Sequence, residues 1–99
     1  KNYAGGLPVT VLFTVMGDKD YESMQKSVET IARTVVYTEL PMERSEKASV
    51  LKHKSYHHDV HAFDDYKTAF ERARTMSKDG LLYVCGSLYF ISSIRSMLL

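Results

Sequence analysis

The chain has 99 residues, of which 44% are hydrophobic and 25% are charged. These values are typical of one globular domain, spanning residues 1–99, and they exclude a disordered chain. The 13 basic and 12 acidic residues leave a net charge of +1, so no excess of positive charge points to a nucleic-acid partner. The chain is also short for a complete enzyme with a nucleotide site and two substrate sites.

Cysteine content and hydropathy indicate the compartment of the chain and whether it crosses a membrane. The single cysteine, Cys85, excludes an internal disulfide and fits a reducing compartment. No apolar run approaches the roughly 18–20 residues that span a bilayer, and no apolar signal core follows the N-terminus. We therefore expect a soluble, cytoplasmic domain with no membrane partner.

The first part of the chain pairs a short apolar run with an amphipathic one. Residues 9–16 (VTVLFTVM) are almost continuously apolar, which is typical of a strand buried on both faces. The charged turn Gly17–Asp20 ends this strand, and Asp18 or Asp20 is placed to cap a helix after it. The expected core face of that helix consists of Tyr21, Met24, Val28 and Ile31.

The same alternation continues to the end of the chain. The expected elements are, in order, a strand over 33–38, a short helix over 45–51, a short strand over 60–63, a helix over 66–76, a strand over 81–85 and a final helix over 86–98. Asp64 or Asp65 caps the middle one of these helices. Its expected core face consists of Tyr66, Ala69, Phe70, Ala73 and Met76. The strand over 81–85 (LLYVC) is apolar throughout and is expected to be buried on both faces.

Strands that alternate with helices predict a Rossmann-like, mostly parallel α/β sheet with helices on both faces. In such sheets ligands bind beyond the carboxyl ends of the strands. We therefore expect any binding site in the loops that follow the strands. The candidate residues in these loops are Asp18, Lys19, Asp20, Glu39, Arg44 and Ser87.

Each candidate has both a functional and a purely structural interpretation. The charges of Gly17–Asp20 either contact a nucleotide, metal or polar substrate, or cap the next helix. Arg44 either clamps a carboxylate or phosphate, or is an ordinary surface arginine. The segment Gly86–Tyr89 offers a hydroxyl and backbone N–H groups, which either bind an anion or serve as a turn and helix cap.

Several chemistries are excluded or disfavoured by missing motifs. GxGxxG, GxxxxGK[ST] and GxSxG are absent, so the chain has no phosphate cradle and no nucleophile elbow of its own. Cysteine phosphatases need an arginine six residues after their cysteine, where this chain has Ile91. The four histidines of the chain are interpreted as part of a polar edge segment and not as a zinc site, because no cysteine pair or HExxH framework accompanies them. These histidines are His53, His57, His58 and His61.

Three strand-end segments, taken together and in order, are similar to a known family. They are FTVMGDKD (13–20), VVYTELPMERSE (35–46) and LLYVCGSLYFISSIR (81–95). In this order they resemble the C-terminal domain of folylpolyglutamate synthase and dihydrofolate synthase, of the Mur ligase superfamily. The segment Thr38–Pro41 with Arg44 is similar in position to an Asp-Asn-Pro-Arg motif whose arginine helps to bind the incoming amino acid. Here Glu39 and Leu40 replace the Asp-Asn pair.

The resemblance implies an ATP-dependent amide ligase. In this family ATP and Mg²⁺ convert a carboxylate of the folate substrate into an acyl phosphate, which the amino group of L-glutamate attacks. The resemblance leaves the catalytic residue unknown and provides no metal ligand. It implies substrate or nucleotide contacts for Asp18, Lys19, Asp20, Arg44, Ser87 and Tyr89.

The family also has an N-terminal ATPase domain with a P-loop, and this domain binds most of the ATP and Mg²⁺. This chain has no P-loop and lacks the family's Asp-Gly-Ala-His-Asn segment. The resemblance therefore implies a fragment of the C-terminal domain, with the ATPase domain of the same parent chain as its partner. We expect no ligase activity from the 99 residues alone. The alternative is a stand-alone α/β ligand-binding or regulatory module without catalysis.

Overall fold

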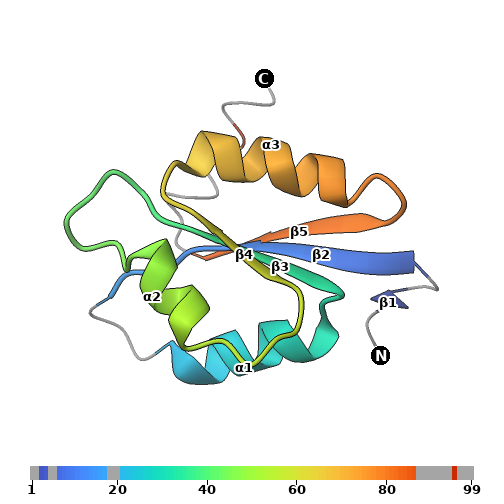
Figure 1. Ribbon diagram of the computed structural model, residues 1–99, viewed down its shortest axis with the longest axis horizontal. Coiled ribbons are helices and arrows are strands. Elements are labelled where there is room, and N and C mark those ends of the chain that lie inside the picture. Colours follow the sequence, from blue (N-terminus) through green and yellow to red (C-terminus); the bar gives the residue numbers. More distant parts are fainter. Residues whose placement is uncertain (1–2, 5–6, 18–20, 87–94, 96–99) are drawn as a thin grey trace.

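A sheet of four parallel strands forms the centre of the molecule. The computed structural model describes residues 3–4, 7–17, 21–86 and 95. The parallel strands are β2 (Leu7–Phe13), β3 (Thr34–Thr38), β4 (Val60–Phe63) and β5 (Leu81–Cys85). They lie in the order β5–β2–β3–β4, and the short β1 (Tyr3–Ala4) pairs antiparallel with the start of β2 (Figure 1). The mostly parallel α/β sheet expected from the sequence is confirmed.

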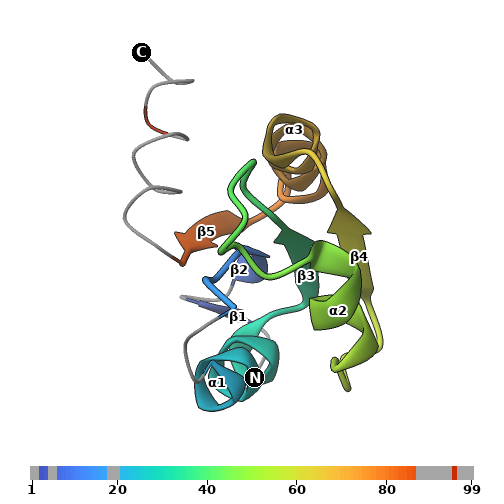
Figure 2. The same cartoon turned by 90° about the vertical axis from the view of Figure 1, so that its left-hand side faces the viewer.

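Helices cover both faces of this sheet, as the alternating pattern predicts. The helices α1 (Glu22–Ile31) and α2 (Ala48–His53) lie on one face, and α3 (Tyr66–Met76) lies on the other (Figures 1 and 2). The helix expected over 86–98 falls largely outside the described residues. In the part of the chain that the structure describes, no helix is long and apolar enough to cross a membrane.

Two apolar clusters hold the helices to the sheet, one on each face. The strand β2 contributes to both, because successive side chains of a strand point to opposite faces. Phe13 packs toward α1 and α2, where its ring meets that of Tyr37 edge-on at 5.8 Å. Leu12 packs toward α3. The predicted core residues of α3 are correct, since Ala69, Phe70 and Ala73 are buried.

The cap of α3 is also as predicted from the sequence. Of the two candidates, Asp65 occupies the N-cap position. Its carboxylate accepts hydrogen bonds from the Lys67 amide at 3.3 Å and from the Thr68 hydroxyl at 2.9 Å. The bond from the Thr68 hydroxyl has the largest effect, and together the two bonds lower the pKa of the Asp65 carboxyl below its ordinary value.

The buried face of α1 differs from the expected one. Met24 and Ile31 are 49% and 45% exposed, whereas Gln25 and Ala32 are almost completely buried. The face toward the sheet thus follows Tyr21, Gln25, Val28 and Ala32. Gln25 is tolerated there because its amide nitrogen donates to the Leu51 carbonyl at 2.9 Å and to the Tyr37 hydroxyl at 3.1 Å. Buried polar groups are stable where they have such partners.

The strand expected over 9–16 leaves the parallel ladder early, at Phe13. Beyond it, Met16 forms an isolated antiparallel bridge with Ser45. The same bridge explains why the short helix begins at Ala48 instead of Ser45. The Arg44 carbonyl and the Glu46 amide on either side of Ser45 bond to the end of the β2 segment, so these groups are not available to a helix.

The expectation that β5 is buried on both faces is wrong. All its residues are partly buried except Tyr83, which is 41% exposed. Among the described strands, β5 pairs only with β2, so it forms the edge of the sheet. An edge strand is covered less completely than a central strand such as β2, in which every residue after Leu7 is buried.

Candidate functional site

The carboxyl ends of the four parallel strands form one edge of the sheet. From β2 the chain passes through α1 to β3 and β4, and it returns through α3 to β5 on the other side of β2. The connection after β2 thus leads to one side of β2, whereas the connection after β4 returns to its other side, so the two diverge. This divergence makes the edge a topological switch point, the position at which open parallel α/β sheets bind ligands.

The ends of β2 and β5 are in direct backbone contact at this edge. The Thr14 amide donates to the Cys85 carbonyl over 3.3 Å. Gly86 follows with a φ of +134°, and a Cβ there would lie 2.1 Å from the Thr14 carbonyl oxygen. Glycine alone fits both conditions. The Thr14 side chain is fully buried, and its hydroxyl has no hydrogen-bond partner among the described residues.

Cys85, the last residue of β5, is not a candidate nucleophile. Its side chain is partly buried, and burial raises the pKa of the thiol above its ordinary value. The thiolate is the reactive form of cysteine, so this environment disfavours nucleophilic catalysis.

The ends of β2 and β3 are joined by the loop that follows β3. The Gly17 amide donates to the Arg44 carbonyl at 2.7 Å, and the Glu46 amide donates to the Val15 carbonyl at 2.9 Å. These two bonds flank the Met16–Ser45 bridge. Two of the predicted site loops therefore lie together, because the backbone of Arg44 holds the first residue of the charged turn.

The structure describes only part of the predicted site. Arg44 lies in the loop after β3, with an exposed side chain. The other substrate and nucleotide contacts named from the resemblance lie outside the described residues. They are Asp18, Lys19, Asp20, Ser87 and Tyr89.

Glu39, which the sequence also placed at this edge, has a structural role. Its carboxylate accepts a hydrogen bond from the Ala48 amide at 2.8 Å, so it caps the start of α2. Its second oxygen lies 3.4 Å from the Lys47 ammonium. With only 15% of its side chain exposed, Glu39 stabilises a helix N-terminus, where a negative charge is favourable.

A polar network that the sequence analysis missed lies beside the charged turn. The Tyr21 hydroxyl donates to a Glu46 carboxylate oxygen at 2.8 Å and accepts from the Lys54 ammonium at 3.0 Å. Lys54 also lies 3.8 Å from the Glu22 carboxylate. Burial raises the pKa of Tyr21 above its ordinary value. No sequence signal links these residues, because Tyr21 and Glu46 are 25 positions apart.

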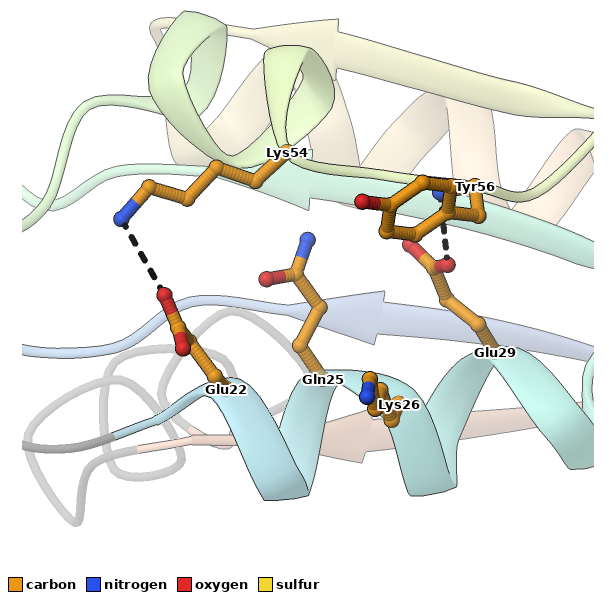
Figure 3. Close-up of a pocket in the computed structure, with 6 residues that line it drawn as sticks. All are labelled: Glu22, Gln25, Lys26, Glu29, Lys54 and Tyr56. Carbon is orange, nitrogen blue, oxygen red and sulfur yellow. Dashed lines mark hydrogen bonds and ion pairs between the residues drawn. The ribbon is translucent and has the colours of Figure 1, made fainter.

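A groove runs from this network along α1 (Figure 3). It begins as a cavity of about 280 Å³ between α1 and the segment after α2, lined by Glu22, Gln25, Lys26, Glu29, Lys54 and Tyr56. Figure 3 shows that its two carboxylates already have partners within the chain, Lys54 for Glu22 and the Tyr56 amide for Glu29. The Tyr37 hydroxyl also donates to Glu29. The two carboxylates of the groove are thus not available to a ligand as unpaired negative charges.

The histidine-rich segment is built into the fold by hydrogen bonds. A ring nitrogen of His57 lies 2.7 Å from the Ala32 carbonyl, and the other accepts from the Asp59 amide at 3.0 Å. His61 pairs with the Asp59 carboxylate at 2.9 Å. Among the residues that the structure describes, no three histidine, cysteine or acidic side chains come together as a metal site.

These features define a Rossmann-like α/β domain whose candidate site lies at the switch point of its sheet. Three strand ends converge there, joined by the Thr14–Cys85 and Gly17–Arg44 backbone contacts.

Comparisons with known proteins point to one particular family. The chain is 31% identical over 96 residues to a dihydrofolate synthase/folylpolyglutamate synthase of Bacillus subtilis (strain 168), a match that covers 91% of the chain. The chain spans about a fifth of that relative, 21% of its length. The chain thus resembles a segment of folylpolyglutamate synthase. No family model matches it.

A solved structure shows the same fold. It is that of Mycobacterium tuberculosis folylpolyglutamate synthase complexed with ADP, which superposes with a TM-score of 0.74 at 20% identity. The match covers 90% of this chain and 23% of that one. The Rossmann-like fold expected from the sequence is therefore also that of a segment of this synthase.

Proposed function

We propose that this chain is part of the C-terminal domain of an ATP-dependent ligase that adds L-glutamate to folates. One observation carries the proposal: the identity to the Bacillus subtilis relative covers 91% of the chain, and so includes all three strand ends at the switch point. The reaction would take place in the cytoplasm, the compartment that the single reduced cysteine fits.

The proposed reaction has two steps. The γ-phosphoryl group of ATP passes to a carboxylate of the folate, which gives an acyl phosphate and releases ADP. The amino group of glutamate then attacks the acyl carbon, and phosphate leaves as the amide bond forms. Water has to be excluded from the acyl phosphate and charge has to be stabilised at the acyl centre.

In this proposal the chain binds and orients substrates at the carboxyl edge of its sheet. Arg44 binds the carboxylate of the incoming glutamate, for which a guanidinium is well suited. Ser87 and Tyr89 at the end of β5, together with the charged turn after β2, contact the nucleotide or the other substrate. Holding two reactants in fixed orientation is itself a large part of such catalysis.

Most contacts to ATP and magnesium are assigned to the ATPase domain of the parent polypeptide. The described residues of this chain do not fit a metal site, since no three potential ligands converge. The chain spans only 21% of the relative, so the rest of that relative is long enough to include such a domain.

Glutamate-dependent ADP formation with a folate acceptor tests the proposal. The complete polypeptide that carries this sequence should form ADP in step with glutamylated folate, and the 99-residue chain alone should form none. Ser87→Ala should lower kcat/KM about tenfold or more, the value of a hydrogen bond to a charged group. The matched change Ser49→Ala, at an exposed position of α2, should leave it unchanged. Activity that is independent of glutamate would contradict the proposal.

A further inference from the structure

The residues on either side of the charged turn, Gly17 and Tyr21, are both bound by the segment 44–46. The first residue of the turn segment, Gly17, donates its amide to the carbonyl of Arg44 at 2.7 Å. At the other end, the hydroxyl of Tyr21 donates to the carboxylate of Glu46 at 2.8 Å. We call this arrangement of Gly17, Tyr21 and the segment 44–46 the strand-end clasp.

One side of the clasp is backbone and the other is side chain. On the backbone side, the Gly17–Arg44 bond is supported by the Met16–Ser45 bridge and by the bond from the Glu46 amide to Val15. These bonds join main-chain atoms. The side-chain half depends on one hydroxyl and one carboxylate, so a single substitution removes it, keeps the donors and acceptors of the backbone half, and shows how far that half depends on it.

The Tyr21 hydroxyl is fully engaged. It donates to Glu46 and accepts from Lys54 at 3.0 Å, while the tyrosine is only 4% exposed. A hydrogen bond between a buried hydroxyl and a carboxylate is stronger than one between neutral groups. The ring of Tyr21 belongs to the core cluster with Phe13 and Val28, so a phenylalanine would keep this packing and lose only the polar contacts.

We infer that Tyr21 and Glu46 are positioning residues, which hold the loop of Arg44 between the end of β2 and the start of α1 at the switch point. The inference rests on the proposed function in one respect, because it assigns Arg44 to the incoming glutamate. Tyr21 and Glu46 touch no reactant in this scheme. They act by holding the backbone of the Arg44 loop against the end of β2.

The test compares two tyrosines that lose the same atom. Tyr21→Phe removes the hydroxyl of the clasp, and Tyr37→Phe removes another buried hydroxyl that donates to a carboxylate, that of Glu29. The Tyr37 hydroxyl accepts from Gln25 and donates to Glu29, both in α1, and it also bonds with Ser55 after α2. The two variants therefore have similar costs in stability, but only one of them opens the clasp.

The first measurement is amide hydrogen exchange in the 99-residue chain, which needs no enzymatic activity. The exchange rate of the Gly17 amide is divided by that of Val35, whose amide binds the Asp59 carbonyl at 3.0 Å. Dividing the two rates cancels the part of the change in exchange that comes from a change in global stability. Tyr21→Phe should raise the ratio about tenfold, the effect of one hydrogen bond to a charged group on local opening. Tyr37→Phe should leave it unchanged, and Glu46→Gln, which keeps an acceptor oxygen, should restore most of the protection lost in Glu46→Ala.

The second measurement is steady-state kinetics of the complete polypeptide. Tyr21→Phe should raise the KM for glutamate about tenfold with little change in kcat, whereas Tyr37→Phe should change neither. An equal response of both variants in the exchange ratio, or no response to Tyr21→Phe, would overturn the clasp. If exchange responds as expected but no variant, including the unaltered protein, uses glutamate, then the proposed function fails and the clasp stands.

Discussion

Gly86 is the residue at which the ends of β2 and β5 come closest. Its φ of +134° is strained for any residue with a side chain, and a Cβ would meet the Thr14 carbonyl oxygen at 2.1 Å. Gly86→Ala should therefore destabilise the chain by about 2–5 kcal/mol, from backbone strain and from forced separation of the two strand ends. Urea denaturation followed by circular dichroism measures this loss.

Gly17 provides the matched control for that change. A Cβ at Gly17 would lie 3.6 Å from its nearest neighbour, the Arg44 carbonyl oxygen, which is ordinary van der Waals contact. Gly17→Ala should shift the free energy of unfolding by no more than about 1 kcal/mol. Equal losses for the two alanine variants would show that the close approach at Gly86 does not govern stability.

At the scale of elements, the helix α1 shows what a sequence pattern can and cannot give. The 3.6-residue period identified the helix and two of its buried residues, Tyr21 and Val28. It selected Met24 as a third because methionine is apolar, yet Gln25 is the buried residue. The reason is tertiary: Leu51 and Tyr37 offer partners to the Gln25 amide, and neither partner is visible from the sequence around α1.

The pairing of β3 with β4 depends on a carboxylate at the start of β4. The Asp59 carboxylate accepts from the Thr34 hydroxyl at 2.7 Å and lies 2.9 Å from a ring nitrogen of His61. Burial alone would raise the pKa of Asp59, but the bonds from Thr34 and His61 outweigh burial and lower it. A lowered pKa means that Asp59 stabilises the fold above its ordinary pKa and loses this effect as the pH falls toward the lowered value.

Asp59→Asn should therefore cost stability at neutral pH and little in acid. The expected loss at pH 7 is about 1 kcal/mol, a modest value because 43% of the side chain is exposed. The difference from the unaltered chain should shrink between about pH 5 and pH 3, as measured by urea denaturation at each pH. Asp64→Asn, at an exposed carboxylate just after β4, should stay within about 0.5 kcal/mol throughout. A constant cost for Asp59→Asn across this range would contradict the assignment.

At the scale of the whole molecule, topology carried the prediction further than local pattern did. Apolar runs that alternate with amphipathic ones were enough to predict a parallel sheet, and the sheet alone places its strand ends on one edge. The proximity of Arg44 to the charged turn follows from that rule. The Tyr21–Glu46 contact does not, because it depends on how the loop after β3 folds back across the end of β2.

The two apolar clusters both contain residues of β2 and β3. We therefore expect the two faces of the sheet to unfold cooperatively. Leu12 faces α3 and Leu51 lies in α2 on the opposite side of the sheet, and both are fully buried. Replacing either leucine with alanine should cost about 2–5 kcal/mol. Because the central strands belong to both clusters, each change should lower a single unfolding transition for the whole chain.

Amide signals of Val50 in α2 and Phe70 in α3, followed by NMR through a urea titration, report on the two faces separately. In Leu12→Ala and in Leu51→Ala the midpoints at Val50 and Phe70 should fall together. Leu7→Ala provides the control, since Leu7 is 45% exposed and should cost less than about 1 kcal/mol. If Leu12→Ala lowers the midpoint at Phe70 and leaves that at Val50 in place, the two faces unfold independently and the shared strands do not couple them.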